Sequence, residues 1–275
     1  MLCAVLALAV AGCDRGDRGP VADPGTLQGP PAGEVEPATD TGAADVPPTL
    51  EDVIEHDPRY VVGISFPPEA RNYPGLASEL DAYARAARAD LEQAVASLGQ
   101  GRPTAPYDLA LNFDLLVETP QVVAVAADGS TYTGGAHGNP LVARFVWLPA
   151  QRRMLTAEGL VPDGDGWRAI SGYVREQLHL ELFERADAAD MEPEERTRFV
   201  RSAGEMIDEG STPDPANFAH FEPVMGPDGR IEALRFVFPP YQVGPYSDGT
   251  RTVVVPAAVL LPHVADEYRG LFATG

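Results

Sequence analysis

Residues 107–117 read Tyr-Asp-Leu-Ala-Leu-Asn-Phe-Asp-Leu-Leu-Val, and apolar side chains recur at every second position from Leu109 to Val117. This period of two is typical of a β-strand that buries one face. Other short β-prone stretches predict further strands at 60–66, 121–127, 141–148, 218–224, 231–238 and 252–255. An antiparallel meander is therefore expected.

Amphipathic helices are predicted between these strands. Over 76–98 the apolar residues recur at spacings of 3, 4 or 7, which favours a helix that ends at Gly99. Asp165 is a suitable N-cap for a second helix, and a third is expected from Pro193. A short apolar helix is expected at 257–264. The whole pattern predicts an α+β fold, in which antiparallel sheets pack with a few amphipathic helices.

The first residues resemble a secretory leader. Residues 2–12 form an unbroken run of apolar or small residues, which as a helix would rise only about 16 Å and could not cross a hydrocarbon core of roughly 30 Å. The run ends in Val-Ala-Gly-Cys, which resembles a bacterial lipobox. This resemblance implies a lipoprotein signal peptide at 1–12 and a diacylglyceryl group on Cys13. An ordinary signal peptide, in which Cys13 has no role, is the alternative.

A linker is expected after the signal peptide. Residues 14–48 contain seven Pro and six Gly, and seven acidic residues against two Arg, with almost no large apolar residue. Such a stretch cannot bury enough apolar surface to offset the entropy lost on ordering. We therefore predict a disordered tether at 13–50 that holds a folded body away from a membrane, in the cell envelope facing the periplasm.

The charge of the chain narrows the partners that it can bind. Its 275 residues include 41 acidic residues and 20 Arg but no Lys, which gives a net charge of −21. No nucleic-acid partner is expected, because affinity for nucleic acid depends on cations that neutralise phosphates. After residue 50 the chain still carries 34 acidic residues and 18 Arg, a net charge of −16, which favours a basic protein partner.

The segment 132–139, Tyr-Thr-Gly-Gly-Ala-His-Gly-Asn, is the densest group of unusual residues. Three glycines in five residues indicate a positive φ or a close backbone approach. His137 could act as a general base, but it has no second histidine at a metal-ligand spacing, so no metal or cofactor is expected. Two interpretations remain open: a structural loop in which His137 and Asn139 bond to backbone, or a catalytic loop.

The segment 238–249, Phe-Pro-Pro-Tyr-Gln-Val-Gly-Pro-Tyr-Ser-Asp-Gly, is stiffened by three Pro and shaped by two Gly. Its two tyrosines, Tyr241 and Tyr246, offer amphipathic surface of a kind enriched at interfaces. The segment is interpreted either as a recognition loop or as a rigid crossover whose tyrosine hydroxyls tie it to a sheet.

These two segments resemble the signatures of a domain pair of the bacterial envelope. Tyr-x-Gly-Gly-Ala-His-Gly-Asn matches 132–139, and Pro-Tyr-x-x-Gly-Pro-Tyr-x-x-Gly matches 240–249. The resemblance covers residue 59 to the C-terminus. It implies a PdaC-type N-terminal domain at 51–130 and an RsiV-type C-terminal domain at 131–275, which could pack as one body. Both signatures contribute the expected binding residues: Tyr132, Gly134, Gly135, His137, Asn139, Tyr241, Tyr246 and Asp248.

Members of this family include the ectodomain of an anti-sigma factor that binds lysozyme and the non-catalytic part of a peptidoglycan deacetylase. This resemblance and the lipobox together imply a lipid-anchored, non-catalytic protein that recognises a lysozyme-like basic protein or a cell-wall ligand such as peptidoglycan. The Asp-Asp-Gly metal motif of the deacetylase is missing from the sequence, so deacetylation is not expected. The alternatives are a hydrolase acting on peptidoglycan or another cell-wall polymer with His137 as base, and an envelope scaffold without a small ligand.

Overall fold

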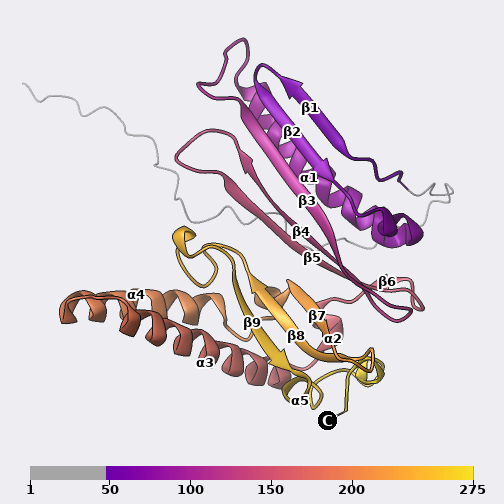
Figure 1. Ribbon diagram of the computed structural model, residues 1–275, viewed down its shortest axis with the longest axis vertical. Helices are drawn as coiled ribbons and strands as arrows, with labels where there is room; N and C mark the ends of the chain where they lie inside the picture. Colours follow the sequence, from indigo (N-terminus) through magenta and orange to yellow (C-terminus); the bar gives the residue numbers. More distant parts are fainter. Residues whose placement is uncertain (1–47, 275) are drawn as a thin grey trace, which may run out of the picture.

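The computed structural model describes residues 48–274, which form two β-sheets with helices packed against them (Figure 1). The larger sheet has six strands in sequence order: β1 (Val53–Asp57), β2 (Tyr60–Ser65), β3 (Tyr107–Glu118), β4 (Val123–Tyr132), β5 (Asn139–Leu148) and β6 (Arg153–Met154). Neighbouring strands are antiparallel except β2 and β3. Helix α1 (Pro74–Ser97) connects these two strands and carries the chain back along the sheet, which makes their pairing parallel. The larger sheet is therefore mixed rather than wholly antiparallel.

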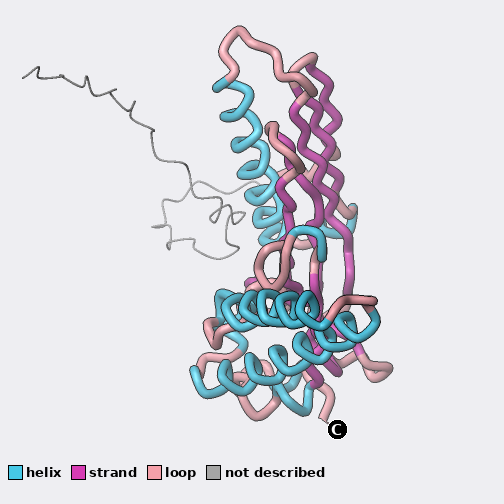
Figure 2. The backbone as a smooth tube through the Cα atoms, turned by 90° about the vertical axis from the view of Figure 1, so that its left-hand side faces the viewer, coloured by secondary structure: helices cyan, strands magenta, loops and turns pink. Residues whose placement is uncertain are grey.

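The smaller sheet is antiparallel and has three strands in sequence order: β7 (Phe221–Met225), β8 (Ile231–Phe238) and β9 (Arg251–Pro256). The other helices are α2 (Ala157–Leu160), α3 (Gly164–Ala188), α4 (Pro193–Gly210) and α5 (Ala257–Leu260), with 3₁₀ turns η1 (Pro68–Asn72), η2 (Pro215–Phe218), η3 (Tyr246–Asp248) and η4 (Arg269–Leu271). The long helices α3 and α4 lie side by side (Figures 1 and 2). The predicted α+β class is confirmed.

The first hydrophobic core lies between α1 and the larger sheet. Along β3 the odd-numbered residues from Leu109 to Phe113 are buried, whereas Ala110 and Asn112 are exposed, as the period of two predicts. Apolar residues of α1, among them Leu80, pack against this buried face. Figure 2 shows α1 lying along one face of the strands.

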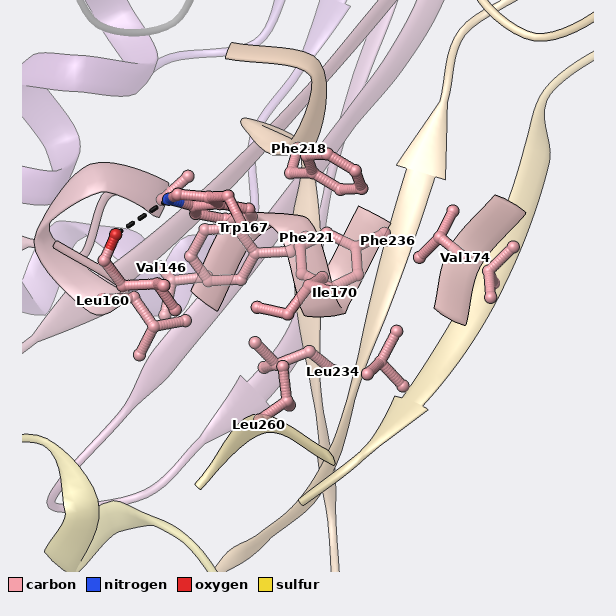
Figure 3. Packing of buried hydrophobic residues seen from close by; sticks show 14 of the residues in the cluster. Val146, Leu160, Trp167, Ile170, Val174, Phe218, Phe221, Leu234, Phe236 and Leu260 are labelled. Atoms are coloured by element: carbon pink, nitrogen blue, oxygen red, sulfur yellow. Dashed lines mark hydrogen bonds between the residues drawn. The ribbon is translucent and has the colours of Figure 1, made fainter. Parts of the chain in front are cut away.

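The second core lies between α3 and the smaller sheet (Figure 3). Trp167, Ile170 and Val174 follow one face of α3 and are buried. The ring of Trp167 stacks on that of Phe218 with 5.2 Å between the ring centroids. The indole Nε1 of Trp167 donates to the carbonyl oxygen of Val161 at 2.8 Å, so the buried polar atom of this side chain has a partner.

The hairpin of β4 and β5 belongs to both cores. Val123 and Val125 of β4 face the first core, and Ala124 between them faces the second. The expected division between residues 130 and 131 lies within β4, whose pairing with β3 and β5 continues across it. The two expected segments therefore share the larger sheet.

Several local details differ from the sequence expectations; β6 and α2, for example, are not among the expected elements. Strand β1 is not among the expected strands, because its Val-Ile-Glu-His-Asp sequence is short and only two of its five residues are apolar. Asp163, not Asp165, is the N-cap of α3, and its Oδ1 accepts the N–H of Asp165 at 3.0 Å. The helix expected at 257–264 ends earlier as α5, because Pro262 has no N–H to continue it.

The predicted signal peptide, Cys13 and nearly all of the predicted tether lie outside the described residues. Within residues 48–274, no helix combines the length and the apolar character needed to cross a bilayer.

Candidate functional site

Two loops from different sheets meet at one surface site. The first loop joins β4 to β5 and carries His137, and the second joins β8 to β9 and carries Tyr241 and Tyr246. The hydroxyl oxygen of Tyr241 lies 3.0 Å from Nε2 of His137. The ring of Tyr246 stacks on the imidazole, with 4.0 Å between the ring centroids and 16° between the planes. We call His137, Tyr241 and Tyr246 the aromatic cluster.

The aromatic cluster faces solvent. Tyr241 is 53% exposed and Tyr246 is 37% exposed, and His137 is exposed as well. The two tyrosine rings lie 5.7 Å apart at 34° to each other. Aromatic side chains that are already held by their neighbours lose little freedom on contact with a partner, and tyrosine is enriched among the residues that dominate interface energies. The geometry of the cluster therefore suits recognition.

The glycines of the first loop allow the turn that presents His137. Gly134 and Gly135 have φ angles of 100° and 102°, which residues with a Cβ rarely adopt. The hydroxyl of Tyr132 donates to the carbonyl oxygen of Gly135 at 3.3 Å. Asn139 begins β5 and pairs with Thr131 of β4. Tyr132 and Asn139 thus stabilise their own hairpin.

Tyr241 has an unusual backbone conformation. Its φ is 75°, and it occupies the third position of a turn in which the N–H of Gln242 donates to the carbonyl oxygen of Pro239 at 3.1 Å. This position normally favours glycine or asparagine, and another residue costs roughly 1 kcal/mol. Backbone strain of this kind clusters at functional sites. Here it places the Tyr241 hydroxyl against His137.

The second loop is fixed to helices α3 and α4. Nη1 of Arg185 on α3 donates to Oδ2 of Asp248 at 2.5 Å. The side-chain amide of Gln242 donates to the carbonyl oxygen of Gly210, at the end of α4, at 2.9 Å and to that of Asn217 at 2.8 Å. Asp248 therefore lies at the base of the site, where it holds the loop in place.

The hydrogen bonds of His137 define what its ring can do. Nδ1 lies 3.0 Å from the carbonyl oxygen of Gly138. Because a carbonyl oxygen only accepts, Nδ1 carries a hydrogen, and in the neutral imidazole Nε2 accepts the hydroxyl of Tyr241. Both ring nitrogens thus have a partner, Nδ1 within its own loop and Nε2 in the second loop. Within residues 48–274, no group of three or more His, Cys, Asp or Glu side chains is placed to hold a metal ion.

The structure brings together three of the expected binding residues, and it adds two that the sequence did not indicate. His137, Tyr241 and Tyr246 meet although they come from different signatures. Gln242 lies inside the second signature, but its role in holding the loop depends on the carbonyl groups of Gly210 and Asn217, to which it donates. No sequence pattern indicated a role for Arg185, because its partner Asp248 is 63 residues away in the sequence.

No family model and no curated protein matches this sequence. The chain is similar in structure to a member of the DUF3298 family from Bacteroides fragilis NCTC 9343, with 16% identity, 80% of this chain and 94% of that chain covered, and a TM-score of 0.50. It is also similar to a DUF3298 family protein from Pseudomonas aeruginosa PAO1, with 16% identity, coverage of 82% and 96%, and a TM-score of 0.51. The fold is therefore shared with proteins of a domain-of-unknown-function family. The PdaC-type and RsiV-type assignments stay predictions.

Proposed function

We propose that this protein is a non-catalytic binding protein of the bacterial cell envelope, anchored through a lipid on Cys13, which recognises lysozyme or a similar basic protein. The observation that carries the proposal is the exposed stack of Tyr246 on His137, with Tyr241 hydrogen-bonded beside it. Exposed tyrosines of this kind are typical anchors at the centre of a protein interface, where the partner removes them from water.

The net charge of the helices that hold the second loop supports a basic partner. Arg185 of α3 and Gly210 at the end of α4 hold the loop that carries Tyr241 and Tyr246, so both helices border the cluster. The segment 158–214, which includes these helices, contains fifteen acidic residues and six Arg. A segment with a net negative charge attracts a basic protein and speeds its encounter with the molecule, and added salt weakens this attraction.

Calorimetry with lysozyme tests the proposal. We expect heat of binding at about 0.05 M salt that decreases towards about 0.5 M salt, and a loss of at least about tenfold in affinity for Tyr246→Ala. Leu116→Ala is the matched control, because Leu116 on β3 is 42% exposed and lies outside the cluster. No heat at low salt, or equal losses for Tyr246→Ala and Leu116→Ala, would overturn the proposal.

The hydrolase alternative has a direct check. In this alternative Nε2 of His137, which lies 3.0 Å from the hydroxyl oxygen of Tyr241, would act as the base. We expect no release of soluble fragments from labelled peptidoglycan. Release by the wild-type protein that disappears in His137→Ala would replace the binding proposal with the hydrolase.

The lipid anchor is tested separately. We expect labelled palmitate to be incorporated into the full-length protein in bacterial cells and not into Cys13→Ser. Incorporation that persists in Cys13→Ser would refute the anchor at this residue without affecting the proposal for the aromatic cluster.

A further inference from the structure

A groove of about 340 Å³ lies on the face of the larger sheet that is turned away from α1. Gly63 of β2 and Ala110 of β3 form its floor, and these residues are paired across the two strands. A Cβ atom added at Gly63 would meet no other atom of residues 48–274 within 4 Å, so this part of the chain leaves the space above Gly63 open. The groove exists because two neighbouring strands place very small side chains next to each other.

One side of the groove is apolar. Ile54 of β1 is paired with Gly63, and it is 78% exposed. Removing an isoleucine side chain from water stabilises a protein or a complex by roughly 2 kcal/mol. An apolar side chain placed over Gly63 would contact Ile54 and recover part of this energy.

The polar part of the groove is acidic. Asp52 and Asp128 line it together with Ser65 and Asn112. Asp128 pairs with Arg144 at 3.1 Å, but the guanidinium of Arg144 also binds a second carboxylate, that of Glu222. No Arg is among the described residues that line the groove, and the chain contains no Lys. A positive charge in the groove would therefore complement its surroundings.

We infer that this groove is a second contact site for the basic partner, and that it receives a short extended segment with an apolar side chain over Gly63 and a Lys or Arg side chain near Asp52 and Asp128. The kind of partner rests on the proposed function, whereas the chemistry of the segment follows from the groove itself. The volume of about 340 Å³ suits a short segment of this kind.

A substitution that fills the groove tests the inference. Gly63→Val places a side chain in open space on a strand, so the protein is expected to fold normally. We would titrate the ¹⁵N-labelled full-length protein with an acetylated Leu-Arg-Leu-Arg peptide and, in a second series, with lysozyme. The peptide is expected to shift the amide signals of Gly63, Ala110 and Asn112, and Gly63→Val should weaken its binding by about tenfold.

Two further variants serve as controls. Gly172→Ala on α3 also adds a Cβ in open space, outside the groove, and should leave the affinity for the peptide within about twofold of wild type. If Gly63→Val does not fold, as judged by circular dichroism, Ala110→Leu fills the same space from the neighbouring strand.

The outcomes separate this inference from the proposed function. Peptide binding in the groove without lysozyme binding supports the groove and removes lysozyme as the partner. If Gly63→Val does not change lysozyme binding and the peptide does not shift the signal of Gly63, the groove is not a contact site. The proposal that the aromatic cluster binds the partner would still stand. A dimer that Gly63→Val converts to a monomer in light scattering also overturns the inference, because a second copy of the chain would then occupy the groove.

Discussion

The hydroxyl oxygen of Tyr241 lies 3.0 Å from Nε2 of His137, although 104 positions separate the two residues in the sequence. His137 follows a strand of the larger sheet, and Tyr241 follows a strand of the smaller one. Their contact therefore joins two loops into one site. The stacking of Tyr246 on the same imidazole completes the aromatic cluster.

The positive φ of Tyr241 predicts an order of stability among substitutions at this position. Tyr241→Asn and Tyr241→Val both remove the aromatic ring, but asparagine tolerates the left-handed region and a β-branched residue does not. We expect Tyr241→Asn to be the more stable variant by about 1 kcal/mol in urea unfolding. Equal stability of the two variants would show that the turn relaxes to a different conformation.

The protein is expected to lose stability in mild acid through His220. Burial, together with the nearby Arg144 guanidinium, lowers the pKa of His220 to about 4 from 6.5, and its buried Nδ1 has no hydrogen-bond partner within residues 48–274. The unfolded chain takes up a proton below about pH 6.5, whereas the folded protein resists it until about pH 4. Stability is therefore fully present above pH 6.5 and is lost, by about 2–3 kcal/mol, as the pH falls towards 4.

Urea unfolding between pH 7 and pH 4 checks this prediction. His220→Asn should show a smaller decrease in the free energy of unfolding over this range than the wild-type protein. His56→Asn is the control, because it removes an exposed histidine of β1 and leaves the buried His220 in place. The assignment of the pH dependence to His220 would be contradicted if the free energy of unfolding still decreased in His220→Asn and no longer decreased in His56→Asn.

The ion pair between the two sheets is expected to be important for stability. Oε1 of Glu222 on β7 lies 2.6 Å from Nε of Arg144 on β5, and their side chains are only 10% and 7% exposed. Glu222→Ala leaves the Arg144 guanidinium buried with fewer partners, which should cost about 3 kcal/mol. Arg235→Ala removes the more exposed partner of Glu222 and should cost less than about 1 kcal/mol. Thermal unfolding measures the stability of both variants. Similar losses of stability would contradict the expectation that the more buried ion pair contributes more.

Replacing each of two glycines of the larger sheet by alanine should change the stability of the protein in opposite directions. A Cβ at Gly129 would lie 2.1 Å from the carbonyl oxygen of Ala110, so Gly129→Ala must displace a strand and should cost about 2 kcal/mol or more. Gly63 has open space, and Gly63→Ala should be neutral or stabilising by about 0.5 kcal/mol. Melting temperatures test this pair, and a neutral Gly129→Ala would show that β3 and β4 separate easily at this point.

The elements that follow from local pattern could be predicted. The helix from 76 to 98 and the strand Ile231–Phe238 agree with the structure to within a few residues, because their apolar periods are long and their ends carry Pro or Gly signals. Strand β1 could not be predicted, since its side chains are mostly polar and its place depends on pairing with β2. The parallel pairing of β2 with β3 could not be predicted either, because it depends on how α1 packs against the larger sheet.

For the candidate site, the sequence by itself determined which two segments are unusual, because glycine, proline and tyrosine are concentrated at 132–139 and 238–249. It also determined the net negative charge that favours a basic partner. Only the tertiary structure decided that His137 meets Tyr241 and Tyr246, and that Arg185 fixes their loop. These contacts join residues that are far apart in the chain. The residues meet because two sheets pack around the shared hairpin of β4 and β5, and no local sequence pattern predicts this packing.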